Sequence, residues 1–368
     1  MQEKTICSVC GATLTEETKR EFDGKVMCET CLEGCSIVCD CCGERVRTED
    51  AQSDSHTTVC NRCYDFSYTT CERCGRIIST ENAYYLDDVD DAPYCCDCHQ
   101  HLSNQVIKSY NYKPEPIFYG SGSLFMGVEL EIDKGGEDNN NAEILLNMAN
   151  RHQEHLYCKH DGSLNEGFEM VSHPMTLEYH ENNMRWSDIF EQARDLGYRS
   201  HQTQTCGLHI HVSRSAFGKT YEDQEEVISR IVYFVEKHWN ELLKFSRRTE
   251  SNMDRWASRY GILTTAKDTY KNAKDKRMGR YVAVNLENYA TIEFRLFRGT
   301  LNHRTFLATL QLVDEICKMA NLLPDKKLEG LSWSDFVIQI PKSKKELIDY
   351  LKSRFLYVNE PMNTREEI

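Results

Sequence analysis

The sequence has no apolar run long enough to cross a bilayer, and no apolar stretch before Cys7 that could act as a secretory signal. Cysteine is scarce after Cys98, where only three of the 18 thiols lie. Basic residues are scarce in residues 1–104, where 9 Lys and Arg stand against 20 Asp and Glu, a net charge of −11. We therefore expect a cytoplasmic protein without a membrane-bound part, whose thiols and acidity are concentrated in an N-terminal region.

The N-terminal cysteines form C-x2-C pairs whose first members, at positions 7, 39 and 71, recur every 32 residues. Two such pairs complete a tetrahedral shell around Zn²⁺, and clustered thiols in a reducing compartment are held by metal rather than by disulfides. We expect three tandem zinc ribbons at 7–31, 39–63 and 71–98, within residues 1–104, each with one structural zinc ion. The predicted ligands are Cys7, Cys10, Cys28, Cys31, Cys39, Cys42, Cys60, Cys63, Cys71, Cys74, Cys95 and Cys98.

Three further cysteines in this region are surplus, namely Cys35, Cys41 and Cys96. Cys42 and Cys95 are preferred over their neighbours because only they keep the C-x2-C spacing. The spacing leaves ligand pairing between the ribbons open.

Charge argues against nucleic acid as the partner of the ribbons. Twelve thiolates around three Zn²⁺ would add a further −6 to the net charge of −11, so a phosphate backbone would be repelled. The remaining interpretations are a protein or peptide partner and a purely structural arm.

The rest of the chain reads as a linker at 105–120, which contains Pro114, Pro116 and Gly120, followed by one globular domain. Helical periodicity appears at about 141–152, 182–196, 222–246 and 303–322, with two short pieces after Leu331. Strands are expected near 124–132, 155–160, 167–172, 206–213, 280–286 and 290–297. This alternation predicts an α+β domain with a largely antiparallel sheet at 121–325, followed by C-terminal helices at 326–368 that pack on it.

Four of these strands carry acids, histidines and an arginine at every other position, at 127–131, 168–171, 206–212 and 292–296. Residues two apart in a strand share a face, so each stretch has one polar and one apolar face. The exposed face of an ordinary surface strand carries Thr, Lys, Ser and mixed charges instead. The pattern therefore predicts one shared site on the floor of the sheet.

A basic run extends from Lys244 to Arg280, with 11 bases against 4 acids. Such runs are usually solvated helix faces. Beside an acidic floor, a flexible basic segment bounded by Gly261 and Gly279 is also a candidate to close over nucleotide phosphates.

The order of the strand motifs resembles the amidoligase family. The motifs are G-x-E-x-E at 127–131, D-G-S-L-x4-E at 161–169, C-G-L-H-x-H at 206–211 and E-F-R-x-F-x-G-T at 293–300, and the match covers roughly residues 120–310. The resemblance implies a glutamine-synthetase-like fold with helices on one side of the sheet. It also implies an ATP-dependent, ADP-forming carboxylate-amine ligase that makes an amide or isopeptide bond through an acyl phosphate.

The resemblance further implies ATP and two divalent cations, Mg²⁺ or Mn²⁺, as cofactors. The residues that resemble the ligands of one cation are Glu131, Asp161 and Glu169. Those that resemble the ligands of the second, beside the nucleotide phosphates, are Glu129, His209 and Glu293. Arg295 resembles the arginine that contacts the transferred phosphoryl group, so Arg295, Glu129, Glu293 and His209 are the expected catalytic residues. Further candidates for cofactor contact are His211, Arg298 and Arg280.

These residue types suit the implied chemistry. Carboxylates are the preferred ligands of Mg²⁺, two such ions neutralise charge on a phosphoryl group, and arginine clamps the same oxygens. Histidine is a poor ligand for Mg²⁺, so His209 indicates either Mn²⁺ or direct contact with phosphate. Two other classes fit part of the pattern: a metal-dependent hydrolase that uses the H-x-H strand, and a non-catalytic zinc scaffold.

Overall fold

The computed structural model describes residues 5–86, 91–103, 105–203, 205–276 and 278–357. They fall into two compact units. The first runs to Gln105 and includes Asn111–Lys113, and the second contains Val106–Tyr110 and the chain from Pro114 onward. Within the described ranges, no helix has the length and apolar character that a membrane span requires.

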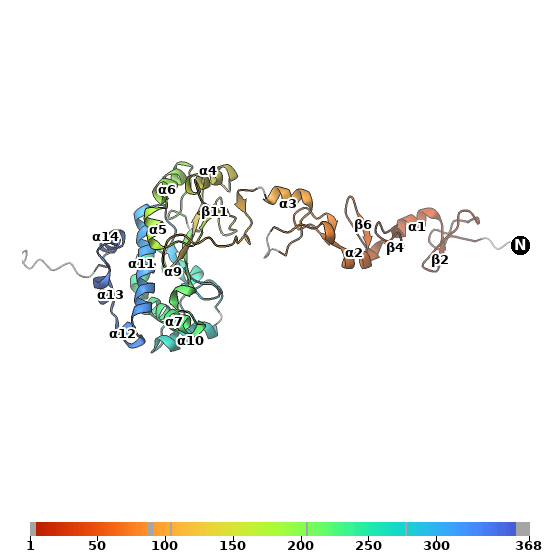
Figure 1. The fold of residues 1–368 in the computed structure, drawn as a ribbon. Helices are drawn as coiled ribbons and strands as arrows, with labels where there is room; N and C mark the ends of the chain where they lie inside the picture. The colour runs from red at the N-terminus through yellow and green to blue at the C-terminus, as the bar shows by residue number, and fades with distance from the viewer. Residues whose placement is uncertain (1–4, 87–90, 104, 204, 277, 358–368) are drawn as a thin grey trace, which may run out of the picture. The chain divides into compact units, whose positions relative to one another are not determined.

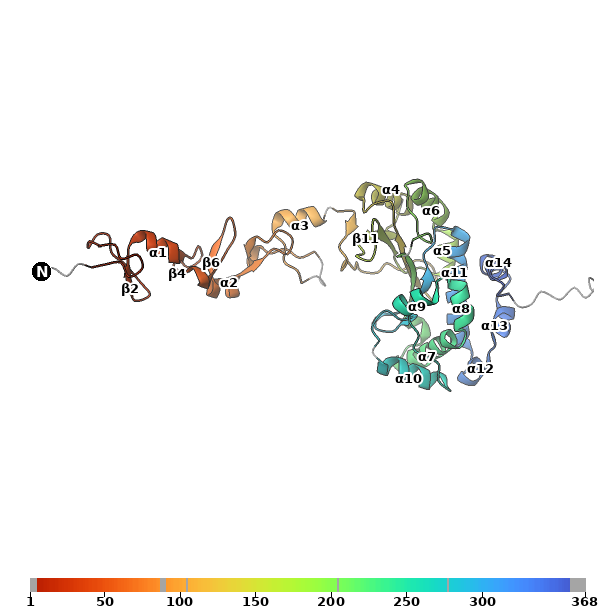
Figure 2. The same cartoon turned by 180° about the vertical axis from the view of Figure 1, so that it is seen from behind.

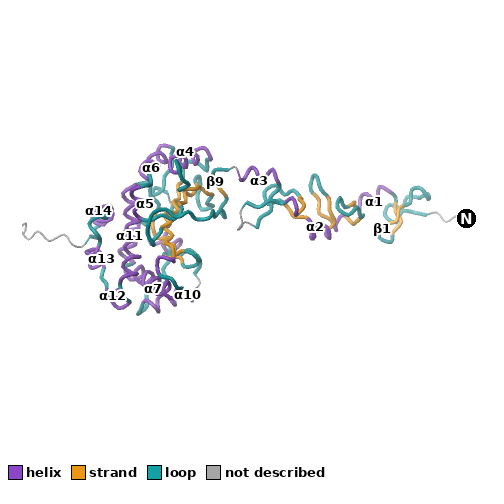
Figure 3. Tube along the Cα trace, in the orientation of Figure 1, coloured by secondary structure: helices purple, strands orange, loops and turns teal. Residues whose placement is uncertain are grey.

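The first unit consists of two-stranded antiparallel hairpins and short helices (Figure 3). Its elements are β1 (Arg20–Phe22), β2 (Lys25–Met27), α1 (Glu29–Cys35), β3 (Ser36–Val38), β4 (Arg45–Arg47), η1 (Thr48–Asp50), β5 (Ala51–Ser53), β6 (Thr58–Cys60), α2 (Asn61–Ser67), β7 (Tyr68–Thr70), β8 (Ile77–Ser79), η2 (Thr80–Asn82) and α3 (Cys96–Ser103). Three separate clusters of four buried residues form its interior, and cysteines belong to each cluster. Three small cysteine modules were predicted here, and this prediction is confirmed.

The second unit is built on a seven-stranded sheet of order β14-β15-β13-β10-β12-β11-β9. Its strands are β9 (Ile107–Lys108), β10 (Met126–Ile132), β11 (Leu156–Lys159), β12 (Phe168–Ser172), β13 (Gly207–Ser213), β14 (Val284–Asn285) and β15 (Thr291–Arg298). Every pairing is antiparallel except that of β9 with β11. The predicted α+β class with a largely antiparallel sheet is confirmed.

Eleven α-helices accompany this sheet in the described part of the second unit, with α11 running along one side of it (Figures 1 and 2). They are α4 (Asn139–Ala149), α5 (Leu177–Asn182), α6 (Trp186–Asp195), α7 (Tyr221–Lys237), α8 (Trp239–Ser246), α9 (Glu250–Trp256), α10 (Ala266–Lys276), α11 (His303–Leu322), α12 (Asp325–Gly330), α13 (Trp333–Gln339) and α14 (Lys345–Ser353), with the 3-10 turn η3 (Arg214–Phe217). The apolar sides of the strands, such as Val128, Leu130 and Phe294, are buried in one continuous core. In that core Trp186 of α6 contacts Phe306 of α11, with ring centroids 4.7 Å apart.

The structure differs from the predicted elements in four places. The expected helix at 182–196 is α6, which begins only at Trp186 because the backbone at Arg185 leaves the helical region, and the preceding α5 was not predicted. The expected helix at 222–246 breaks at His238 into α7 and α8 for the same reason. Short polar connections inside a periodic pattern do not show in the periodicity itself.

The other two differences concern the expected linker and the basic run, for which helix faces and a flexible segment were both considered. Residues 105–120, expected to be a linker, contain β9, whose Ile107 is buried beside Cys158 at the edge of the sheet. The basic run contains two helices, α9 and α10, rather than one flexible segment. In α10, Tyr270 and Ala273 are buried and the Tyr270 hydroxyl donates to Glu225 of α7 at 2.9 Å, so apolar packing fixes this helix.

Candidate active site and metal centres

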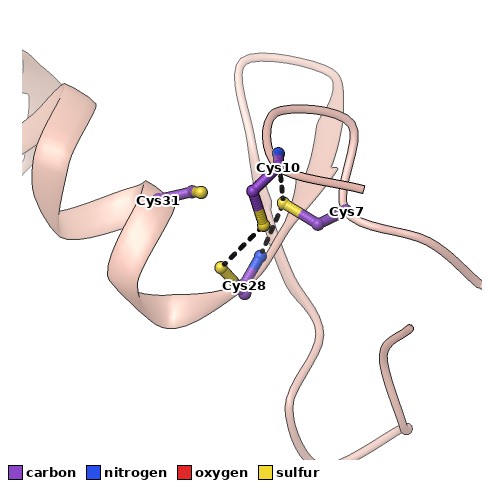
Figure 4. A group of neighbouring side chains, drawn as sticks. All are labelled: Cys7, Cys10, Cys28 and Cys31. Carbon is purple, nitrogen blue, oxygen red and sulfur yellow. Dashed lines mark hydrogen bonds between the residues drawn. The ribbon is translucent and has the colours of Figure 1, made fainter. Parts of the chain in front are cut away.

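In the first cysteine module the four predicted ligands converge on one point (Figure 4). The Sγ atoms of Cys10 and Cys28 lie 3.7 Å apart, close to the edge of about 3.8 Å that a tetrahedron of Zn–S bonds would have. The Sγ atom of Cys7 accepts backbone N–H groups from Cys28 at 3.3 Å and Cys10 at 3.5 Å. These N–H groups, with that of Cys10 the largest contribution, lower the pKa of Cys7 to about 6, so this sulfur is prepared to bind metal as a thiolate.

The other two modules repeat this arrangement. The paired sulfurs are 4.0 Å apart for Cys42 and Cys60 and 3.9 Å apart for Cys74 and Cys95. The three groups are Cys7, Cys10, Cys28 and Cys31; Cys39, Cys42, Cys60 and Cys63; and Cys71, Cys74, Cys95 and Cys98. All three fit structural zinc in the predicted pairing within each ribbon, and neither Cys41 nor Cys96 belongs to one of these three groups.

In the second unit, strand register brings the predicted acids and histidines onto one face of the sheet. Strand β10 lies between β12 and β13, and directly opposed residues share a face. The register places opposite one another Glu129 and His209, Glu131 and Glu169, and His211 and Glu293. We refer to these six residues as the floor.

The floor is crowded and largely buried. His211 Nε2 lies 3.2 Å from Glu129 Oε1, and His209 Nδ1 lies 3.4 Å from Glu129 Oε2 and 3.5 Å from Glu293 Oε1. Possible cation groups include two sets of floor residues whose donor atoms lie within 4.8 Å of one another. These are Glu129 with Glu169 and His209, and Glu129 with His211 and Glu293. Compared with the groups that the resemblance implies, Glu129 takes part in both of these groups, and His211 lies near Glu293 in addition to His209, with its Nε2 3.9 Å from Glu293 Oε1.

Burial and neighbouring charges divide the floor into two electrostatic halves. Burial opposes ionisation of Glu129, but the adjacent histidines, His211 first, outweigh it and hold the pKa of Glu129 well below its usual range. Burial lowers the pKa of His211, but Glu129 outweighs this and the net shift is upward. Burial raises the pKa of Glu169 well above its usual value, and the charge of Glu129 adds to the effect. Burial likewise raises the pKa of Glu131.

The second half of the floor therefore holds carboxylates that need a positive charge. Lys159 of β11 lies opposite Glu169, and its Nζ is 3.3 Å from Glu169 Oε2. Asp161, in the loop after β11, adds negative charge that raises the pKa of both Glu131 and Glu169. One lysine beside several converging carboxylates leaves negative charge uncompensated, and such oxygen-rich surroundings fit a hard divalent cation.

Arginines border the floor. Arg295 donates to the Glu293 carboxylate through Nη1, and its guanidinium faces the Tyr281 ring at 5.8 Å. Arg248, between α8 and α9, donates to the Phe297 carbonyl at 3.0 Å, and burial lowers its pKa to about 10. The buried Nε atoms of Arg247, Arg248 and Arg295 have no hydrogen-bond partner in the described structure. Buried guanidinium donors without partners favour a bound anion.

A bulge in β15 brings one more arginine to this side. Between Leu208 and Ile210 the register with β13 shifts, so that Arg298 lies opposite Gly207 while Glu293 lies opposite His211. Strict alternation from Glu293 would have turned Arg298 to the apolar side. Gly207 itself is required by space, because a Cβ there would lie 2.7 Å from Arg248 Nη2 and 2.8 Å from His209 Nε2.

Arg280 makes its hydrogen bonds outside the floor. Its guanidinium is exposed and donates to the hydroxyls of Tyr110 and Tyr281, and these contacts raise its pKa. The structure shows no contact between Arg280 and a floor carboxylate in the described chain. Arg280 shares the Tyr110 ring with Lys159 and the Tyr281 ring with Arg295, and its predicted role in cofactor binding stays a prediction.

Sequence reasoning gave no role to Lys159, Arg247 or Arg248. The position of Lys159 could have been predicted to lie near the site, since it belongs to a predicted strand two residues before Asp161. Arg247 and Arg248 had no such signal, because they belong to a basic run that also contains solvated lysines, and only tertiary packing buries them and brings Arg248 to the floor.

A comparison with curated proteins found no match. Among solved structures, a bifunctional glutathione synthetase from Pasteurella multocida is similar with a TM-score of 0.37 and 12% sequence identity. The alignment covers 63% of this chain and 46% of that protein, so this chain spans less than half of its length. Glu129 and Glu131 precede the segment that a family model matches, and the other floor residues lie inside it. Residues 147–317 match the family described as "Putative amidoligase enzyme", which confirms the predicted resemblance over this segment.

Proposed function

We propose that this protein is an ATP-dependent, ADP-forming carboxylate-amine ligase. One observation carries the proposal: a buried floor of carboxylates and histidines adjoins arginines whose Nε–H groups have no partner. A metal-bound phosphate chain requires carboxylates that bind its cation and arginines that bind its phosphate oxygens. The floor and its neighbouring arginines offer both. The match to the "Putative amidoligase enzyme" family supports the same assignment.

The reaction follows from the thermodynamics of amide formation in water, which is uphill without activation. The substrate carboxylate attacks the γ-phosphorus of ATP, ADP leaves, and an acyl phosphate forms. An amine then attacks the acyl carbon, phosphate leaves with the oxygen it gained, and the nitrogen loses a proton. Two hard cations at the floor would neutralise negative charge on the phosphates.

The residues of the floor have separable roles in this proposal. Glu129, Glu293 and His209 would hold one cation, and Glu131 and Glu169, with Asp161 beside them, would hold the other. Glu293 is positioned for this by Asn285, whose Nδ2 donates to its Oε2 at 2.8 Å. Glu131 is positioned by the backbone N–H of Gly207. These contacts fix the carboxylates before any ligand arrives.

Arg295 and Arg248 would bind the oxygens of the transferred phosphoryl group. The Arg295 guanidinium is held at the floor by Glu293 and Tyr281, and its Nε–H has no partner in the described chain. Removing such a preorganised donor typically lowers the turnover rate by about 10² to 10³. Arg248→Gln and Arg295→Gln should each show a loss of this size in ADP formation.

The test is equilibrium binding of a non-hydrolysable ATP analogue to the full-length, zinc-loaded protein, with Mg²⁺ and with Mn²⁺. The floor variants Glu129→Gln and Glu293→Gln should weaken binding at least tenfold, whereas Glu143→Gln, on the exposed face of α4, should not. Mass spectrometry of products formed from ATP with panels of amines and carboxylates would identify the bond. Absence of nucleotide binding at millimolar concentration, or unchanged binding in both floor variants, would refute the ligase. Bond cleavage without nucleotide would indicate a hydrolase instead.

We also propose that the zinc modules bind a protein or peptide that takes part in ligation. Support comes from the acidic net charge of residues 1–104 and from exposed apolar side chains, of which Phe66 on α2 is 88% exposed. Deleting residues 1–104 should then spare nucleotide binding and lower ligation of the true substrate. Full ligation by the truncated protein would contradict this role.

A further inference from the structure

A cavity lies beside the N-terminus of α11, and its wall adjoins the backbone of the floor, because the lining Ser200 hydroxyl donates to the Glu131 carbonyl at 2.8 Å. Its volume is about 700 Å³, and it is lined by α6, the loop after α6 and the first turn of α11. Its ionisable lining residues are all bases: Arg194, Arg199, His201, His303 and Arg304. No carboxylate is among the residues that line it, and no floor residue reaches it.

The arginines of this cavity have no carboxylate partners in the part of the chain that the structure describes. Arg194 donates through Nη1 to the carbonyl of Leu301. Arg199 donates to the carbonyls of Tyr198 at 2.6 Å and Arg194 at 3.1 Å. Carbonyl oxygens orient these guanidinium groups and leave their positive charge uncompensated.

The two carboxylates that act on the lining His303 each have another partner. Asp188 and Glu346 both act on the charge of His303, but Asp188 is paired with Arg185. Glu346 accepts a hydrogen bond from Gln311 at 2.8 Å. Neither is free to move into the cavity and neutralise it.

The N-terminus of a long helix also lies at the wall of this cavity. Helix α11 has 20 residues, and its first turn, with His303 and Arg304, forms one wall. The N-terminus of such a helix carries partial positive charge from its free N–H groups. The helix N-terminus and the guanidinium groups therefore both favour a bound negative charge.

We propose that this cavity binds a ligand that carries two or more oxyanion groups, either phosphates or carboxylates. A single phosphate would leave most of a cavity of this size empty, since cavities of about 300–1,000 Å³ hold whole organic ligands. A nucleotide-sized phosphate ester and a short acidic peptide both have the required charge and size. The site does not depend on the proposed ligase chemistry, because it shares no side chain with the floor.

The experiment is calorimetric titration of the full-length, zinc-loaded protein in buffer free of Mg²⁺ and Mn²⁺. One arm uses tripolyphosphate and the other uses a triglutamate peptide. We expect at least one of them to bind. Arg304→Gln should weaken that binding about tenfold or more, and Arg199→Gln should add a similar factor, because each removes one charge-assisted contact.

The controls separate this site from the floor. Lys326→Gln removes one exposed charge on α12 and should leave binding unchanged, and so should the floor variant Glu169→Gln. Arg304 is exposed and its replacement should not affect folding, which thermal unfolding would verify. Lack of binding by both probes, or equal binding by wild type and Arg304→Gln, would overturn the proposal. Because no divalent cation or ATP is present, this result is independent of whether the ligase proposal stands.

Discussion

Acid should destabilise the second unit through one histidine, His180, whose imidazole is completely buried. Its Nε2 lies 3.0 Å from the Met126 carbonyl and its Nδ1 lies 3.3 Å from the Trp186 indole nitrogen. The indole N–H can only donate, so Nδ1 must accept and Nε2 must carry the single proton. A second proton would go to Nδ1, where it would face the indole donor inside the core.

The free-energy consequence follows from the pKa. Burial lowers the pKa of His180 to about 4, against about 6.5 in the unfolded chain. Between these values the unfolded state binds the extra proton and the folded state does not, so stability falls as pH falls from about 6.5 to about 4. The contribution of His180 to this loss is about 2.5 kcal/mol at pH 4.5, and it approaches about 3.4 kcal/mol below pH 4.

The assay is denaturant unfolding of wild type and His180→Gln at pH 7.5 and pH 4.5, followed by tryptophan fluorescence. All four tryptophans lie in the second unit, so the zinc modules do not contribute to the signal. Glutamine can accept from Trp186 and donate to Met126 but does not titrate. The wild type should lose about 2.5 kcal/mol more than the variant over this pH range. His238, whose pKa burial also lowers to about 4, is present in both proteins and cancels. Parallel losses in the two proteins would refute the reasoning.

Three further outcomes are expected. Lys344→Met should destabilise the second unit by about 3–5 kcal/mol, because Lys344 is buried and paired with both Asp314 and Glu315; Lys342→Met, exposed, is the matched control for the unfolding measurement. Gly207→Ala should weaken Mg²⁺-dependent binding of the nucleotide analogue, because the added methyl group would displace Arg248 and His209, while the circular-dichroism spectrum should stay that of the wild type. Unchanged affinity would contradict the predicted clash between the methyl group and these two side chains. Atomic emission should find three zinc ions per chain, and a zinc chelator should unfold the first unit without changing tryptophan fluorescence; fewer than three would exclude one of the cysteine groups.

The elements of the fold that sequence predicted best are those whose pattern is local. The helix expected at 303–322 is α11, with the same bounds, because Asn302 accepts from the Thr305 N–H at its start and apolar residues recur along it. The strands with alternating acids and histidines were each placed to within about two residues. The C-x2-C pairs were readable for the same reason, since each is a local turn; the spacing left open whether pairs of different ribbons share a metal, and the structure groups the cysteines within each ribbon.

What escaped prediction depends on contacts across the fold. The strand at 105–120 is only two residues long, and no periodicity marks it before Ile107 meets Cys158 in the sheet. The bulge that turns Arg298 toward the site is a property of the pairing between β13 and β15. Arg248 reaches the floor because the α8–α9 connection lies over Gly207, which a single sequence does not reveal.

The two kinds of metal centre should therefore respond differently when metal is removed. In each zinc module only four residues form the buried interior, so the folding free energy has to come from metal binding. The floor is built on a sheet with a continuous apolar core beneath it, and protein donors already hold its carboxylates, as Asn285 holds Glu293. A chelator that strips both should unfold the first unit and leave the second folded, with its floor ready to bind a divalent cation again. The structure thus distinguishes cysteine groups that would need metal for folding from a floor that would hold a cation only for the proposed chemistry.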